Sequence, residues 1–112
     1  MELKQTEIGN IVVLEMMGKV MGGPDATVLN DKLHEIVGQG KKKVVVDLGQ
    51  VTSMNSTGLG ILISGLTTMR NTGGDLKLAN VTERIQNLLM ITKLKTVFEA
   101  HATVDKAAAS FA

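Results

Sequence analysis

The spacing of the hydrophobic positions changes once in the middle of the chain. From Val44 to Leu48 every residue except Asp47 is apolar, which is typical of a parallel strand covered on both faces. Further on, apolar residues recur at helical spacing, namely Leu59, Leu62, Leu66 and Met69, with Ile61 and Ile63 widening the stripe. We therefore expect a buried strand followed by a helix that packs one face.

A polar segment, Gly49 to Thr57, separates this strand from this helix, and it ends in Asn55-Ser56-Thr57-Gly58. These residues are typical of a helix start, because a small side-chain oxygen there can accept a hydrogen bond from an unpaired amide. Unpaired amides and the positive end of the helix dipole also converge near Ser56, so a phosphate on its hydroxyl would be stabilised. Serine at a helix start is most often only a cap, and this feature alone favours that structural explanation.

The N-terminal segments predict a hairpin followed by a helix. Residues 2 to 7 and 11 to 17 flank the turn pair Gly9-Asn10, an arrangement that favours two antiparallel strands. After the break at Gly22-Gly23, Pro24 suits a first helical turn, because its missing amide would be unpaired there. This helix carries an apolar stripe closed by Gly38 or Gly40, and the stripe comprises Ala26, Leu29, Leu33, Ile36 and Val37.

The C-terminal part predicts one more strand and helix, a short edge strand and a terminal helix. Gly73-Gly74 ends the central helix before a strand. Asn80 and Glu83 resemble a capping box that opens a short helix, and Val97 with Phe98 suggests the edge strand. The remaining apolar positions are Leu76, Leu78 and Ala79 in the strand, Ile85, Leu88 and Leu89 in the short helix, and Val104, Ala107, Ala108 and Phe111 in the terminal helix from Thr103.

This order of elements predicts an α/β fold with a mixed sheet of four or five strands, centred on Val44 to Leu48, and with helices mainly on one face. Strands joined by single helices are parallel, so the loops after them leave from one end of the sheet. Those loops are Gly18 to Asp25, Gly49 to Thr57 and Asn80 to Thr82. We expect that end to be the working surface.

Composition narrows the class of protein. A chain of 112 residues suits one domain over residues 1–112, and 44% hydrophobic with 21% charged residues is typical of a globular protein. A net charge of +1 gives no electrostatic case for nucleic acid, and the run Lys41 to Lys43 is typical of a solvated lead into a strand. Cysteine is absent, and neither a membrane-spanning run nor a signal peptide is evident, so we expect a cytoplasmic protein without direct membrane insertion.

The residues that could carry catalysis do not form a recognisable set. His34 and His101 have no further ligand at metal spacing, and Asp47 at a strand end more often bonds nearby amides. The stretch Gly58-Leu59-Gly60 lacks the ending of a phosphate-binding loop, and close helix packing explains its glycines better. We therefore expect no enzyme, no metal and no cofactor. Weak nucleotide binding has no motif behind it.

The stretch from Val46 to Gly60 reads Val-Asp-Leu-Gly-Gln-Val-Thr-Ser-Met-Asn-Ser-Thr-Gly-Leu-Gly. It resembles the signature of STAS domains of the anti-sigma factor antagonist type, in which a hydrophobic strand ends in Asp-Leu and a Met-Asp-Ser-Ser-like turn leads into Gly-Leu-Gly and an apolar helix. The resemblance covers nearly the whole chain in order and length. It implies that a partner kinase phosphorylates a residue of that turn, and the matching position is Ser56, with Thr57 as its rival.

Two positions depart from the family pattern. Asn55 stands where the family usually has an Asp before the phosphoacceptor, and Met21 stands where the pattern Gly-x-x-Asp, here beginning at Gly18, usually ends. Both departures remove a carboxylate near the switch, which bears on the usual kinase contacts rather than on the fold.

Two readings of the function follow from the resemblance. In the first, the protein sequesters an anti-sigma factor kinase when Ser56 is unphosphorylated and releases it when Ser56 is phosphorylated. In the second, it is a STAS scaffold subunit of a stress-signalling or lipid-transport assembly and is never phosphorylated. The partner-binding surface implied by the first reading comprises Met21, Gly22, Gly23, Asn55, Ser56, Thr57 and Gly58. The oligomeric state stays open.

Overall fold

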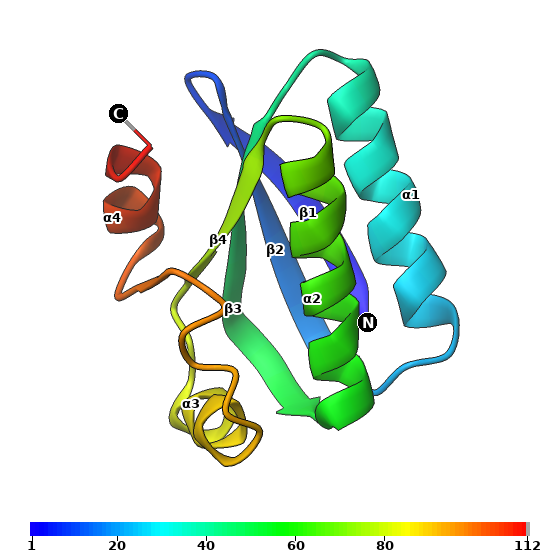
Figure 1. The fold of residues 1–112 in the computed structure, drawn as a ribbon, viewed down its shortest axis with the longest axis vertical. Coiled ribbons are helices and arrows are strands. Elements are labelled where there is room, and N and C mark those ends of the chain that lie inside the picture. The colour runs from blue at the N-terminus through cyan, green and yellow to red at the C-terminus, as the bar shows by residue number, and fades with distance from the viewer. Residues whose placement is uncertain (112) are drawn as a thin grey trace.

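The computed structural model describes residues 1–111, which are built around a five-stranded sheet with its strands in chain order (Figure 1). β1 (Glu2–Ile8) pairs antiparallel with β2 (Ile11–Val20) across the two-residue turn at Gly9-Asn10. The sheet continues in parallel through β3 (Lys43–Met54), β4 (Asp75–Ala79) and β5 (Ala100–His101). The predicted mixed sheet and hairpin are confirmed.

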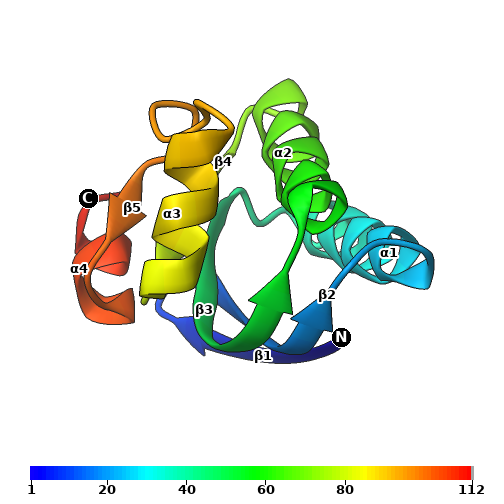
Figure 2. The same cartoon turned by 90° about the horizontal axis from the view of Figure 1, so that it is seen from below.

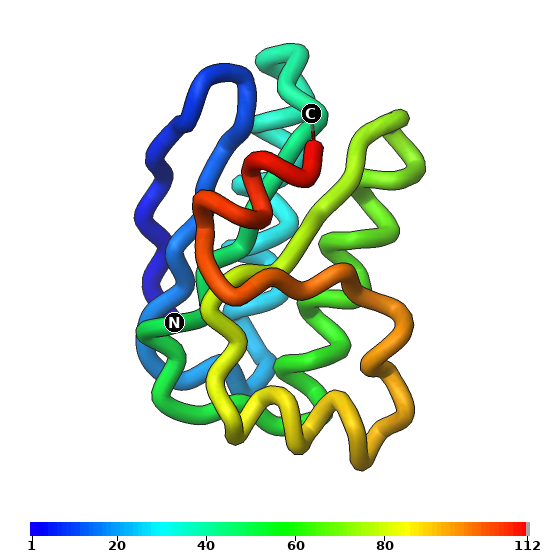
Figure 3. The backbone as a smooth tube through the Cα atoms, turned by 90° about the vertical axis from the view of Figure 1, so that its left-hand side faces the viewer, coloured from blue at the N-terminus to red at the C-terminus, as the bar shows by residue number. Residues whose placement is uncertain are grey.

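Three of the four helices cover one face of this sheet, as predicted. α1 (Pro24–Gly38), α2 (Ser56–Asn71) and α3 (Glu83–Ile91) lie on that face, whereas the short α4 (Val104–Ala109) lies on the other (Figures 1 and 2). Seen from the side of α4, the terminal helix crosses the sheet near the middle of the molecule (Figure 3). Two hydrophobic layers result, a large one under α1, α2 and α3 and a small one under α4.

The middle of β3 is buried from both sides. Val44 and Val46 point into the large core, while Val45 packs with Ala107 and Ala108 of α4 in the small one. None of these three valines has measurable exposure. The strand is apolar throughout because its alternate side chains pack against helices on opposite faces of the sheet, as the sequence suggested.

β3 runs six residues further than its apolar run, which corrects the prediction of a polar link from Gly49. Its register with β2 shifts twice. The first shift lies between the pairs Glu15↔Asp47 and Met17↔Gln50, and the second lies between Gly18↔Val51 and Lys19↔Ser53. At each shift β3 carries one more residue than β2, as in a β-bulge. Buried positions then fall at Leu48, Val51 and Met54, three residues apart. An alternating pattern cannot reveal such a strand, and the real link to α2 is Asn55 alone.

Two predictions for the C-terminal part are wrong in detail. α3 is capped by Thr82, whose hydroxyl accepts a hydrogen bond from the Ile85 amide at 3.3 Å, and not by Asn80. Asn80 lies in the left-handed region with φ 53°. The edge strand is Ala100–His101, because Phe98 enters the large core from an irregular segment instead of pairing with β4.

The start of α2 packs directly on the end of β2. A Cβ on Gly58 would lie 1.9 Å from the carbonyl oxygen of Val20, so only glycine permits this approach. Gly60, by contrast, is exposed, and a Cβ there would meet nothing within 4 Å. Close packing therefore explains Gly58, as the sequence suggested, but it does not explain Gly60.

A polar group holds α4 on the sheet. The buried Lys77 ammonium of β4 donates hydrogen bonds to the Ser110 hydroxyl at 2.7 Å and to the Ser110 carbonyl at 3.1 Å. It also lies 2.7 Å from a carboxylate oxygen of Glu99 and 4.4 Å from the centre of the Phe111 ring. This hydrogen bond from Lys77 lowers the pKa of the Glu99 carboxyl, and burial opposes the change only in part.

The contrast between the two glycines of α2 makes a test of this packing. Gly58→Ala should destabilise the protein by about 1–3 kcal/mol, because the new methyl group must displace backbone. Gly60→Ala should be neutral or should stabilise by about 0.5–1 kcal/mol, because alanine favours the helix and the site is open. Urea unfolding of the two variants checks this. Equal effects of the two substitutions would contradict the packing described here.

Stability should depend on pH through Glu99. Because its folded pKa is lowered, Glu99 contributes stability above the unfolded value of 4.5, and that contribution is lost as the pH falls through the folded value. Glu99→Gln should therefore be less stable than the wild type near pH 7 and similar to it near pH 3 in urea unfolding. Glu2→Gln, at an exposed carboxylate of β1, is the control. A difference between Glu99→Gln and the wild type that persists unchanged at the acidic pH would refute this assignment.

Candidate partner-binding and modification site

Asn55 joins the two loops that the sequence singled out. Its side-chain oxygen accepts a hydrogen bond from the Gly58 amide at 2.8 Å and so caps α2. Its side-chain nitrogen donates to the Met21 carbonyl at 3.3 Å. One amide group therefore fixes the helix start and the loop after β2 at the same time, a task for which a donor and an acceptor are both needed.

A second contact fits the two loops together. The methyl group of Thr57 lies so close to Gly22 that a Cβ on that glycine would be 2.7 Å from it. Beside this contact, Met21 leaves 41% of its surface exposed, and Gly23 is exposed as well. The structure thus brings together all seven predicted residues, Met21, Gly22, Gly23, Asn55, Ser56, Thr57 and Gly58, in one patch at the end of the sheet.

Ser56 is the first residue of α2, and Asn55 is the N-cap. The expectation that Ser56 serves as the helix cap is therefore wrong. Its side chain is exposed, and within residues 1–111 its hydroxyl takes part in no hydrogen bond. The Gly58 amide bonds the Asn55 side chain and the Leu59 amide bonds the Asn55 carbonyl at 2.9 Å. The amides of Ser56 and Thr57 precede them in the first turn, where α-helices leave their donors unpaired.

The first turn of α2 and the two residues that depart from the family pattern carry no charged side chain. The first turn of α2 holds no acidic residue, and neither Asn55 nor Met21 supplies a carboxylate. A negatively charged group on Ser56 would therefore meet unpaired amides and the positive end of the helix dipole with no adjacent carboxylate in that turn to oppose it.

The third predicted loop, Asn80 to Thr82, lies apart from Ser56. β4 ends at Ala79 opposite Asp47, while β3 continues beyond that point. Asn80 donates to an Asp47 carboxylate oxygen at 3.0 Å, and the Gly49 amide donates to the same oxygen at 2.9 Å. Asp47 is thus a structural acceptor, as expected from its place at a strand end. Arg84 of α3 donates a hydrogen bond to the Thr52 carbonyl near the end of β3 at 3.2 Å.

Catalytic or metal-binding clusters do not stand out in the part of the chain that the structure describes. No group of three or more His, Cys, Asp or Glu residues within 1–111 could hold a metal ion. His34 is exposed on α1, and His101 is half-buried with Nε2 3.5 Å from Glu99. None of the helices among these residues has both the length and the apolar character needed to cross a membrane.

Sequence reasoning missed the partners that hold this patch in shape. The start of α2 packs against the Val20 carbonyl, and Asn55 donates a hydrogen bond to the Met21 carbonyl. Every residue type has a backbone carbonyl, so the pattern of side chains cannot predict these two partners. The available signal was Asn55 itself, since asparagine is among the preferred N-cap residues and lies directly before the first helical residue.

Comparison with known proteins assigns the family. The STAS domain model matches residues 2–107. The chain is 34% identical to the anti-sigma-B factor antagonist of Bacillus subtilis, over 90% of this chain and 89% of the relative. An anti-sigma factor antagonist from Mycobacterium paratuberculosis, 19% identical, superposes with a TM-score of 0.81 over 97% of this chain and 92% of that one. The phosphorylated form of SpoIIAA from Bacillus, 15% identical, gives 0.73 over 99% and 100%. The chain therefore belongs to the STAS domain family, among the anti-sigma factor antagonists, which are non-enzymatic proteins.

Proposed function

We propose that this protein is a phosphorylation-switched antagonist of an anti-sigma factor. In its unphosphorylated form it binds and sequesters an anti-sigma factor that is also a serine kinase, and in its phosphorylated form it releases that partner. Transcription is regulated through this exchange of partners. The observation that carries the proposal is the exposed hydroxyl of Ser56, which forms no hydrogen bond within residues 1–111 and lies at the unpaired first turn of α2.

The proposed switch is electrostatic and local. Phosphorylation of Ser56 adds about −1.5 to −2 charges, which the helix N-terminus accommodates within the domain. A partner surface that fits a neutral hydroxyl would be opposed by the same charge. Asn55 already fixes the backbone of the first turn, so the modified protein needs no refolding to receive the phosphate. Release follows from a changed contact rather than from a changed fold.

The proposed contact surface is the patch formed by the seven residues from Met21–Gly23 and Asn55–Gly58. Its exposed Met21 supplies an adaptable apolar side chain on the loop that Asn55 connects to the start of α2, which suits a protein partner. We propose a single domain over residues 1–112, acting in the cytoplasm, without nucleic acid, cofactor or metal. Two relatives support the switch by their names alone: one antagonises anti-sigma-B factor, and SpoIIAA is known in a phosphorylated form.

Ser56→Ala should abolish phosphate incorporation by the cognate kinase while the partner still binds, because the methyl group is neutral and small. Ser56→Asp should weaken that binding, because its carboxylate places a negative charge at the same point. The measurement is a kinase assay with phosphopeptide mapping, joined to a binding titration, using a cognate kinase that is first sought among the genes neighbouring this protein's gene.

Two matched variants control the assay. Ser64→Ala removes another exposed serine of α2, and Thr57→Val removes the rival hydroxyl while its methyl groups keep the contact with Gly22. Both should be phosphorylated normally. Phosphate mapped to Thr57, or unchanged uptake by Ser56→Ala, would remove Ser56 from this role. No uptake with any neighbouring kinase would favour the scaffold reading, in which the protein is never phosphorylated.

Asn55→Asp should speed phosphate incorporation, because an Asp at this position can supply the charge that asparagine lacks for orienting the kinase or its metal. The variant keeps an acceptor for the Gly58 amide but loses the donor to the Met21 carbonyl. We therefore expect faster uptake together with a loss of stability of at most about 1 kcal/mol. Asn55→Ala, which loses both bonds, is the control and should be less stable without faster uptake. Slower uptake by Asn55→Asp would count against a charge-based role for this position.

A further inference from the structure

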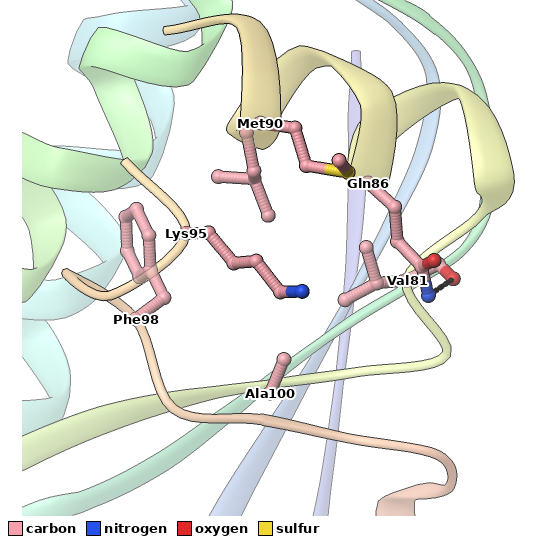
Figure 4. Close-up of a pocket in the computed structure, with 7 residues that line it drawn as sticks. Val81, Gln86, Met90, Lys95, Phe98 and Ala100 are labelled. Atoms are coloured by element: carbon pink, nitrogen blue, oxygen red, sulfur yellow. Dashed lines mark hydrogen bonds between the residues drawn. The ribbon is translucent and has the colours of Figure 1, made fainter. Parts of the chain in front are cut away.

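A hollow of about 400 Å³ lies between α3 and the irregular segment that leads to β5, apart from the Ser56 patch (Figure 4). Its wall is mainly apolar and comprises Val81, Leu89, Met90, Phe98 and Ala100. The hollow forms because the chain turns away from α3 at Lys93, where φ is 61°, and returns to the sheet only at β5.

One cation projects into this apolar hollow. The side chain of Lys95 runs across it, and the ammonium lies among Val81, Gln86 and Ala100 (Figure 4). Within residues 1–111 that ammonium forms neither a hydrogen bond nor an ion pair. Lys77, the other lysine near β5, is by contrast fully engaged with Glu99 and Ser110. Lys95 is exposed, so its ammonium is hydrated and free to pair with a ligand anion, while the adjacent apolar wall can receive the apolar part of the same ligand.

The residues around this hollow add further polar and apolar groups that a ligand could contact. Gln86 bonds the Val81 carbonyl weakly, at 3.5 Å, so its amide group remains able to serve a ligand. A second hollow of about 370 Å³ shares Val81, Gln86 and Ala100 with the first and is also lined by His101 and Ala102, so the two hollows join into a groove between α3 and β5. Met90, which lines the first hollow, leaves 60% of its surface exposed. The groove therefore offers an apolar wall, the Gln86 amide, the Lys95 ammonium and, in its second hollow, the His101 ring.

We propose that this groove binds a free medium-chain carboxylate. The carboxylate pairs with the Lys95 ammonium beside the Gln86 amide, and the alkyl chain lies against Leu89, Met90 and Phe98. A carboxylate needs only one or two donors, which matches this site, whereas a phosphate or nucleotide is held by a cluster of amides or by several cations. The volume lies within the range of small-molecule sites, about 300–1,000 Å³.

Three small molecules separate the contributions of charge and chain. The full-length protein, labelled with ¹⁵N, is titrated with octanoate, with octan-1-ol and with acetate, and the amide shifts are followed by NMR. Octanoate should shift amides of residues 81 to 101 and leave those around Ser56 unchanged. Octan-1-ol and acetate should each bind at least about fivefold more weakly than octanoate, since each lacks one of the two contributions.

Lys95→Gln should weaken octanoate about three- to tenfold, because an exposed ion pair contributes modestly, and should leave octan-1-ol unchanged. Lys93→Gln, at an exposed lysine of the same segment, is the matched control and should bind octanoate as the wild type does. Equal binding of octanoate and octan-1-ol by the wild type would overturn the anionic class of ligand and favour an apolar protein contact instead. Equal octanoate affinity of Lys95→Gln and the wild type, or no localised shift at millimolar ligand, would overturn the site. Neither result bears on phosphorylation of Ser56.

Discussion

The close approach of the Gly58 backbone to the Val20 carbonyl sets the first turn of α2 against the end of β2, and the rest of the seven-residue patch depends on it. A side chain at Gly58 would separate the two elements. The Asn55 side-chain nitrogen would then lie too far from the Met21 carbonyl to donate its hydrogen bond. The contact between Thr57 and Gly22 would also be lost. Each of these contacts relies on the same short distance, so the two loops form one surface only while that distance is kept.

The length of β3 explains how the chain reaches this arrangement. Two bulges let β3 continue beyond β4 and bend along β2, so that Met54 still enters the core while Asn55 arrives beside the end of β2. A strand ending at Leu48, opposite the level where β4 ends, would deliver the helix start near Asp47 instead. The same irregularity explains why the loop at Asn80 lies apart from Ser56, although both follow parallel strands.

Patterns of apolar residues were sufficient for the sheet, the hairpin, the covered face and the helix stripes, because each depends on which side chains are buried. They failed where backbone groups decide the structure. The bulges changed the spacing of Leu48, Val51 and Met54 to three and made a strand look like a loop. α3 is capped by Thr82 and not by Asn80, because Asn80 has a left-handed backbone conformation and donates its side-chain hydrogen bond to Asp47. The resemblance to the family identified the seven residues of the patch. It could not predict the contacts that join them, because those contacts involve backbone groups and distances.

Asn55 combines two roles that an aspartate could not both fill. As an acceptor it caps α2, and as a donor it holds the Met21 carbonyl. Where the family pattern has carboxylates at these two positions, this chain has an amide at Asn55 and a thioether at Met21. The seven-residue patch therefore carries no charged side chain, and Asn55 connects its two loops by hydrogen bonds. The phosphate proposed for Ser56 would be the first formal charge on a patch that has no charged side chain. The loss of the two carboxylates is therefore compatible with a switch and bears mainly on how a kinase recognises it.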